Sequence, residues 1–207
     1  SITADENCSA PTKVEWQYKS TAPVEGRGQS AFKPFNPSGP RPADLAHATV
    51  NGHSVPYIVR LETGTINRAV YQIAYLDDPV NPRATQAFMP PPNWNGRLFY
   101  TFGGSCMAGY IQGGSSGGVL NDLHLSRGYA VASSSLNVFG NNCNELLAAE
   151  SMMMTKERFI EAYGPPRWTF GFGCSGGSYQ QHQIGDNYPG LLQGIIPGCS
   201  FPEVGFA

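Results

Sequence analysis

The chain has 207 residues, enough for one domain with a sizeable hydrophobic core. Its formal net charge of −2 and its 14% charged residues give no basic surface, which argues against nucleic acid as a partner. No apolar run approaches the roughly 18 residues that a membrane-spanning helix needs, so we expect no membrane contact.

Residues 1–95 predict strands and loops that pack onto a sheet. The clearest strand signals in this part are the alternating or apolar stretches 12–20, 55–61 and 69–76. Asn51-Gly52 predicts a tight turn between two strands. The stretch 21–43, rich in proline, glycine and serine, predicts a loop.

Residues 96–207 predict the central core, because strand and helix signals alternate there. In chain order they are strand 97–102, short helix 119–126, strand 128–135, helix 146–163, strand 168–172, a helix to about 187, and strand 192–197. This alternation predicts an α/β fold with a mostly parallel sheet and helices on both faces. Ligands of such sheets sit at the carboxyl ends of the strands.

The strand at 168–172 leads into a Gly-x-Ser-x-Gly pentapeptide at residues 173–177, and a helix follows. A glycine-flanked turn between a strand and a helix lifts a serine hydroxyl clear of the sheet, where a substrate can reach it. We therefore predict that Ser175 is the catalytic nucleophile of an α/β-hydrolase fold. The alternative is a chance pentapeptide in a glycine-rich chain.

Acyl transfer also needs hydrogen-bond donors aimed at the developing oxyanion. The first donor is expected from the backbone N–H of Gly176, directly after the nucleophile. The second is expected from the loop after strand 97–102, which contains Gly104, Ser105 and Cys106, with Ser105 or Cys106 preferred. The alternative is an ordinary loop with a structural cysteine.

None of the histidines suits the role of catalytic base. His182 is two helical turns after Ser175, about 10 Å farther along the helix axis, and beyond hydrogen-bond reach. His47 and His53 belong to the N-terminal strands, and His124 precedes the amino end of a central strand.

The candidate acids after the serine are Asp186 and Glu203, and neither is followed by a histidine, as the expected order requires. We therefore expect the acid and the base to lie outside this chain, on a second polypeptide produced by cleavage after Ala207 or on a missing segment. The sheet would then be one domain, incomplete at the C-terminus of this chain.

The chain has five cysteines, and no C-x-x-C spacing or nearby histidine predicts a zinc site. An exported protein with disulfides is the favoured interpretation, and Cys106 and Cys143 are candidates for a structural disulfide. The odd number leaves one sulfur that is free or bonded to another polypeptide. The alternative is a reduced protein with several buried thiols. We expect no metal and no cofactor.

The nucleophile turn Gly173-Cys174-Ser175-Gly176-Gly177 resembles that of the tannase and feruloyl esterase family, in which a cysteine directly precedes the serine. The resemblance covers about residues 96–200 and implies that Cys174 is disulfide-linked to a cysteine directly after the catalytic histidine, on another segment. The family pattern is Gly-Cys-Ser-x-Gly-Gly, so the glycines here come one place earlier. Processed two-chain members of the family would suit a chain that ends at Ala207.

The first interpretation is therefore a secreted or periplasmic serine hydrolase that cleaves a small-molecule or polymeric carboxylic ester through an acyl-serine intermediate. An amidase, acyltransferase or polyester depolymerase on the same scaffold is the alternative among enzymes. A catalytically silent binding module that keeps the hydrolase sheet is the alternative from another class.

Overall fold

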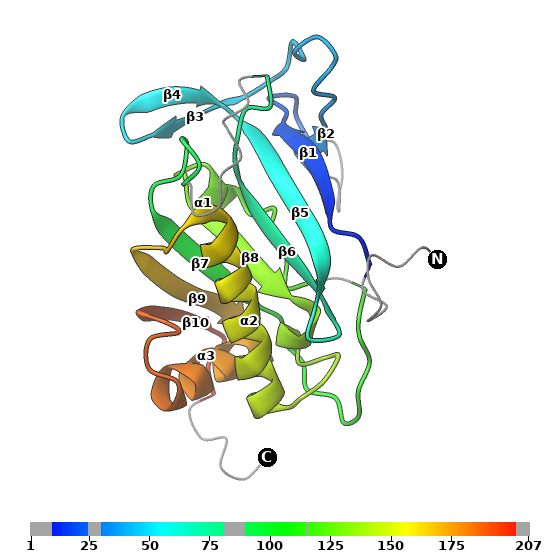
Figure 1. Ribbon diagram of the computed structural model, residues 1–207, viewed down its shortest axis with the longest axis vertical. Helices are drawn as coiled ribbons and strands as arrows, with labels where there is room; N and C mark the ends of the chain where they lie inside the picture. The colour runs from blue at the N-terminus through cyan, green and yellow to red at the C-terminus, as the bar shows by residue number, and fades with distance from the viewer. Residues whose placement is uncertain (1–9, 25–29, 81–89, 115, 202–207) are drawn as a thin grey trace.

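The computed structural model describes residues 10–24, 30–80, 90–114 and 116–201, and its centre is an eight-stranded sheet (Figure 1). Along the sheet the strands follow the order β10-β9-β7-β8-β6-β5-β1-β2. Their bounds are β1 Lys13–Lys19, β2 Phe32–Pro34, β5 Ile58–Ile66, β6 Ala69–Leu76, β7 Arg97–Phe102, β8 Ala130–Ser134, β9 Trp168–Cys174 and β10 Gly194–Gly198.

The sheet is mixed, which corrects the expectation of a mostly parallel sheet. β10, β9, β7 and β8 pair in parallel, whereas β8 with β6, β6 with β5, β5 with β1, and β1 with β2 are antiparallel. For β5 and β6, the cause is the short connection between them. β5 and β6 are joined at Asn67 and Arg68, both with positive φ, and so tight a turn can only connect antiparallel strands.

The N-terminal strands thus extend the same sheet by edge-to-edge pairing. β2 lies within a stretch whose composition predicted only loop. It pairs with β1 through Gln17 opposite Pro34 and Lys19 opposite Phe32. Only three residues long, β2 is too short to give an alternating pattern that the sequence could reveal.

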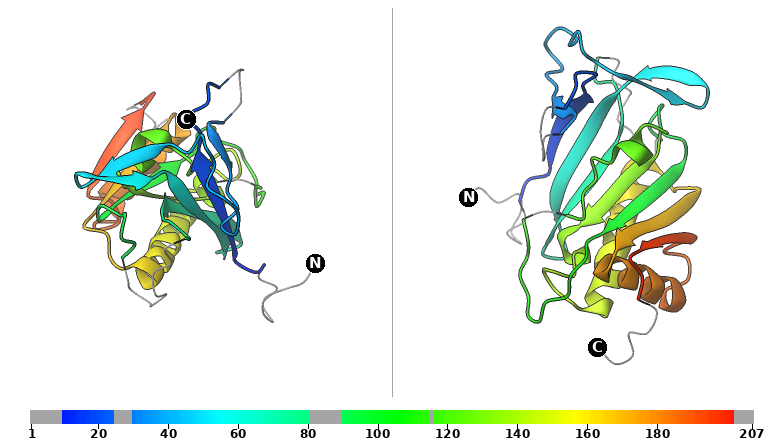
Figure 2. Two further views of the ribbon diagram at one scale, coloured as in Figure 1. Left: turned by 90° about the horizontal axis from the view of Figure 1, so that it is seen from above. Right: turned by 180° about the vertical axis from the view of Figure 1, so that it is seen from behind.

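The two faces of the sheet are covered differently (Figures 1 and 2). Helices α2 (Glu145–Tyr163) and α3 (Gly176–Asn187) pack on one face. The short helix α1 (Asp122–Leu125) and the hairpin of β3 (His47–Val50) and β4 (His53–Pro56) pack on the other. Helices on both faces are thus confirmed, although one face is covered largely by a hairpin.

Each strand supplies side chains to both faces, as the two-residue period of a strand requires. On β7, Leu98 and Tyr100 face the α2 side, and Phe99 faces the hairpin side. β8 is buried along its whole length, and its Ala132 faces the α2 side whereas its Val131 faces the hairpin side. The core therefore lies on both sides of the parallel half, whose carboxyl ends carry the candidate site.

Helix α2 is held in place by its ends and by a buried ion cluster. The Asn144 side chain accepts a hydrogen bond from the Leu147 amide (2.9 Å) at its start. Near its end, Arg158 pairs at 3.0 Å with Glu62 of β5, which is 1% exposed. Burial alone would raise the pKa of Glu62, but hydrogen bonding from Tyr163 and the positive charge of Arg158 lower it below its usual range.

Within the described ranges, no helix has the length and apolar character needed to cross a bilayer.

Candidate active site

Ser175 occupies a tight turn between the carboxyl end of β9 and the start of α3. Its φ of 59° and ψ of −123° are a costly conformation for a residue with a side chain, and the side chain is exposed. Its amide donates to the carbonyl oxygen of Gly198 at the end of β10 (3.1 Å). The neighbouring strand therefore holds the turn, and the hydroxyl is left open to solvent.

Three glycines of the turn are required by close approach to a second loop. A Cβ on Gly173 or Gly177 would lie 2.5 Å from the carbonyl oxygen of Phe102, the last residue of β7. A Cβ on Gly176 would lie 2.1 Å from the carbonyl oxygen of Ser105. No side chain could fit at these distances, so the glycines let the turn pack directly on the backbone of the loop after β7.

The loop after β7 is fixed on its other side by the segment 137–140. The Gly103 amide donates to the Asn137 carbonyl oxygen (2.8 Å), and the Gly104 carbonyl oxygen accepts from the Gly140 amide (3.0 Å). Ser105 has a φ of 70°, which turns the chain past the nucleophile. The structure thus brings Gly104, Ser105 and Gly176 together around Ser175.

Two buried glutamines that the sequence analysis did not single out hold the turn and the loop together. Gln180 Nε2 donates to the carbonyl oxygens of Gly103 and Asn137 (3.1 and 3.2 Å). Gln181 Nε2 donates to the carbonyl oxygen of Gly173 (3.1 Å), and its Oε1 accepts from the Ile196 amide. Both side chains are 0% exposed. The available signal was a pair of polar residues on the helix directly after the serine.

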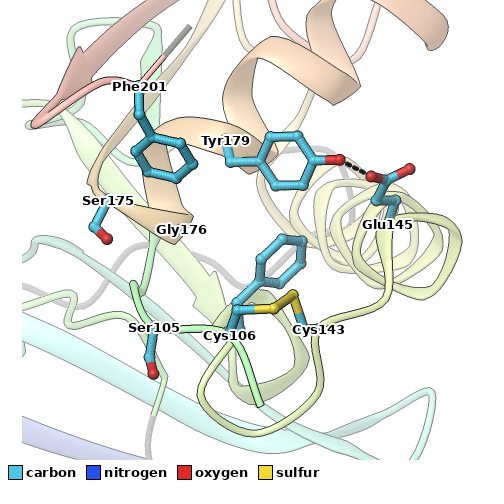
Figure 3. A pocket seen from close by; sticks show the side chains of 9 residues that line it. Ser105, Cys106, Cys143, Glu145, Ser175, Gly176, Tyr179 and Phe201 are labelled. Atoms are coloured by element: carbon cyan, nitrogen blue, oxygen red, sulfur yellow. Dashed lines mark hydrogen bonds between the residues drawn. A yellow bond between two sulfur atoms is a disulfide. The ribbon is translucent and has the colours of Figure 1, made fainter. Parts of the chain in front are cut away.

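A cavity of about 510 Å³ opens beside Ser175 (Figure 3). Its wall is formed by Ser105, Cys106, Phe139, Cys143, Glu145, Ser175, Gly176, Tyr179 and Phe201. In Figure 3, Ser175 and Ser105 lie on one side and Glu145 on the other, with Phe201 and Tyr179 between them. The volume suits a small organic group.

The described part of the chain contains two disulfides. Cys106 and Cys143 are joined, with a Cα–Cα distance of 4.9 Å, and this bridge lines the cavity. Cys174 is joined to Cys199 within the chain, at 5.0 Å. The expectation that Cys174 pairs with another segment is therefore wrong, because β9 and β10 are parallel neighbours and bring their carboxyl ends within bonding distance. Cys8, the fifth cysteine, lies outside the described residues.

The four histidines of the chain are placed away from the cavity. His47, His53 and His182 are exposed, and none of them lines the cavity. His124 is buried at 4% exposure and stacks on Phe99 with ring centroids 3.7 Å apart. Burial lowers the pKa of His124 to about 4, so it is a neutral core residue near pH 7.

Of the two candidate acids, Asp186 lies within the described residues and does not line the cavity. Asp186 is exposed on the last turn of α3, and Glu203 lies outside the described residues. Within the described ranges, no three His, Cys, Asp or Glu side chains come together in a way that could hold a metal ion.

Comparison with known proteins identifies the family of the chain. The chain matches, over residues 1–207, a family described as the tannase-like family of unknown function (DUF6351). No curated protein matches it. The resemblance to tannases, which was expected over about residues 96–200, is confirmed at the level of the family. This protein belongs to the tannase-like family DUF6351.

Proposed function

We propose that this protein is a serine hydrolase that cleaves a carboxylic ester through an acyl-serine intermediate. The observation that carries the proposal is the conformation of Ser175, an exposed serine held at positive φ where β9 meets α3, at the wall of a cavity. A strained serine on a strand-to-helix turn is the arrangement of the nucleophile in α/β-hydrolases. Membership of a tannase-like family supports the same reaction.

In the proposed reaction, Ser175 Oγ attacks the ester carbonyl carbon while an imidazole takes its proton. The negative charge then develops on the carbonyl oxygen. The proton passes from the imidazole to the departing alkoxide, which leaves as an alcohol. The acyl group stays bonded to Ser175. Water attacks the acyl-serine in the second half, releasing the carboxylic acid and restoring the hydroxyl.

We place the oxyanion between the backbone amides of Gly176 and Ser105. The Gly176 amide is the first of α3, so no acceptor within the helix is available to it. Carbonyl and amide of a trans peptide point in opposite directions. The Gly104 carbonyl points at the Gly140 amide, so the Ser105 amide points away from segment 137–140.

The same argument disfavours Cys106 as the second donor. The Ser105 carbonyl oxygen lies against Gly176, so the amide of the Ser105–Cys106 peptide points away from Gly176. Of the two donors that the sequence left open, Ser105 is therefore the one we propose.

The base and the acid are proposed to come from polypeptide outside these 207 residues. This rests on the positions of the four histidines, none of which lines the cavity. The exposed side chain of Ser175 leaves room for an imidazole to approach. A secreted or periplasmic location is proposed from the two disulfides, which persist in oxidising compartments.

The absence of an imidazole at the cavity also favours a second candidate, a binding module without catalytic activity. The two are separated by hydrolysis of 4-nitrophenyl esters with the complete gene product. Ser175→Ala should lower kcat by at least about a thousandfold. Ser38→Ala, at an exposed serine of the segment before β3, should retain the activity. A complete gene product that hydrolyses no ester faster than buffer would favour the binding module.

A further inference from the structure

Among the described residues that line the cavity beside Ser175, Glu145 supplies the only charged side chain. It is the first residue of α2, where the helix dipole stabilises a negative charge. No Lys, Arg or His of the described ranges forms an ion pair with it. As far as the described part of the chain extends, the carboxylate therefore faces the cavity without a positive partner.

Two neutral donors on α3 fix the direction of this carboxylate. The Tyr179 hydroxyl donates to Glu145 Oε1, and Gln183 Nε2 donates to Oε2 at 3.0 Å. Each oxygen keeps further acceptor capacity, because an ionised carboxylate has about four lone-pair sites. The two contacts hold the group still without neutralising it.

The polar character of the cavity is therefore divided. Near Ser175 the wall is formed by Ser105, Ser175 and Gly176. Near Glu145, the Tyr179 hydroxyl donates its proton to the carboxylate, so these two side chains offer acceptors to a ligand. Phe139, Tyr179 and Phe201 supply aromatic surface in the same wall (Figure 3).

We propose that Glu145 sets the specificity of this site by accepting a hydrogen bond from a hydroxyl or ammonium group on the cavity-bound part of the ester. An ester that carries a carboxylate in that position is excluded, because two negative charges would meet in a partly enclosed space. The inference rests on the proposed function, since it assigns a substrate class to the same cavity. It concerns binding, however, and can be measured without catalysis.

The test uses four matched ligands, methyl benzoates with a 4-methyl, 4-hydroxymethyl, 4-aminomethyl or 4-carboxy group. Their dissociation constants are measured by calorimetry on the Ser175→Ala variant of the complete gene product, which cannot turn them over. The 4-hydroxymethyl and 4-aminomethyl compounds should bind about tenfold more tightly than the 4-methyl compound. This is the effect of one hydrogen bond to a charged group. The carboxy ester should bind most weakly.

Adding Glu145→Gln should abolish the advantage of the aminomethyl ester and raise the affinity for the carboxy ester. The oxygen of the new amide at position 145 can keep the contact with Tyr179. If the side-chain amide of Gln183 rotates by half a turn, its Oε1, which has no hydrogen-bond partner, can accept from the new NH₂ group. The control is Glu157→Gln, on the exposed side of the same helix, which removes one charge without touching the cavity.

The outcomes are distinguishable from failure of the proposed function. Equal affinity of the Ser175→Ala variant for all four esters, or a pattern that Glu145→Gln leaves unchanged, would overturn the specificity proposal. A preference between the 4-hydroxymethyl and 4-aminomethyl compounds shows which donor the site favours, and a preference for either one supports the specificity proposal. Absence of ester hydrolysis by the unmodified protein concerns Ser175 alone and leaves the binding measurement valid.

Discussion

Gly176 is the residue at which the nucleophile turn and the oxyanion loop come closest. A Cβ there would lie 2.1 Å from the Ser105 carbonyl oxygen, a backbone atom that a rotamer change cannot move. Gly185, later on the same helix, has only Ile195 Cγ2 within 4.0 Å of an added Cβ. A side chain is therefore excluded at Gly176 and can be accommodated at Gly185, a difference that the sequence alone does not show.

Gly176→Ala should separate the turn from the loop and lower kcat for ester hydrolysis by about a hundredfold, the usual cost of one oxyanion donor. Gly185→Ala should retain the activity and raise the free energy of unfolding by up to about 1 kcal/mol, since alanine is the better helix former. Kinetics and urea unfolding of the two variants measure both effects. Equal activity of the two variants would contradict the assignment of the oxyanion site.

His124 makes the stability depend on pH. Its pKa is about 4 in the folded state and 6.5 in an unperturbed side chain, so the unfolded chain binds the proton more strongly between these values. Stability is therefore retained above about pH 6.5 and lost as the pH falls toward 4, at about 1.4 kcal/mol for each unit of pKa difference. His124→Phe should flatten this dependence, and the exposed His182→Gln should not.

Urea unfolding at pH 7 and pH 5 measures the effect. Phenylalanine also keeps the stacking on Phe99 and removes the buried Nε2 that has no partner. The variant should thus be at least as stable as the unmodified protein at pH 5. An equal loss of stability between pH 7 and pH 5 in both proteins would show that other groups cause it.

At the scale of elements, the parallel strands β9 and β10 determine the disulfide beside the nucleophile. Their paired ends place Gly198 opposite Cys174, and Cys199 follows directly. The chain-entropy model gives about 3.5 kcal/mol for a bridge that closes a loop of this length. The bridge and the hydrogen bond from the Ser175 amide hold the same two strand ends.

A chymotryptic map under non-reducing conditions tests this connectivity. Cleavage after the aromatic residues and Leu192 should give a linked pair of peptides, 173–179 with 193–206, because the bond between Phe201 and Pro202 resists chymotrypsin. A second linked pair should contain Cys106 and Cys143. Peptide 173–179 joined to a sequence from any other polypeptide would instead support the pairing implied by the family resemblance.

Most elements could be predicted from local pattern, and the arrangement of the sheet could not. Helix α2 is marked by Asn144 at its start and Gly164-Pro165-Pro166 at its end, and β7 to β9 are apolar runs bounded by turns. The pairing of β6 with β8 depends on contacts between residues about sixty positions apart, and no local signal encodes them. The partner of Cys174 was missed for the same reason.

The candidate site was predictable in part. Ser175, Gly176 and the 103–106 loop were found because strand, turn and helix follow one another in the sequence. Gln180, Gln181 and Glu145 were not, since their importance arises from packing between α3, α2 and the oxyanion loop. A residue that acts through tertiary contacts is not marked by the periodic pattern of a helix or a strand in the sequence.

At the scale of the whole molecule, the parallel half of the sheet carries every group proposed for the reaction, and the antiparallel half extends it. The missing component is an imidazole. Because His124 is buried and the other three histidines do not line the cavity, we propose that the base for hydrolysis comes from additional polypeptide. The complete gene product should therefore be the active species.

The most direct measurement of the central claim is labelling of the complete gene product with a fluorophosphonate, followed by peptide mass spectrometry. These reagents form a stable adduct with a serine that a neighbouring base activates. The account predicts one adduct, on Ser175 in peptide 173–179, and none after Ser175→Ala. A protein that remains unlabelled, or an adduct on another serine that persists after Ser175→Ala, would contradict it.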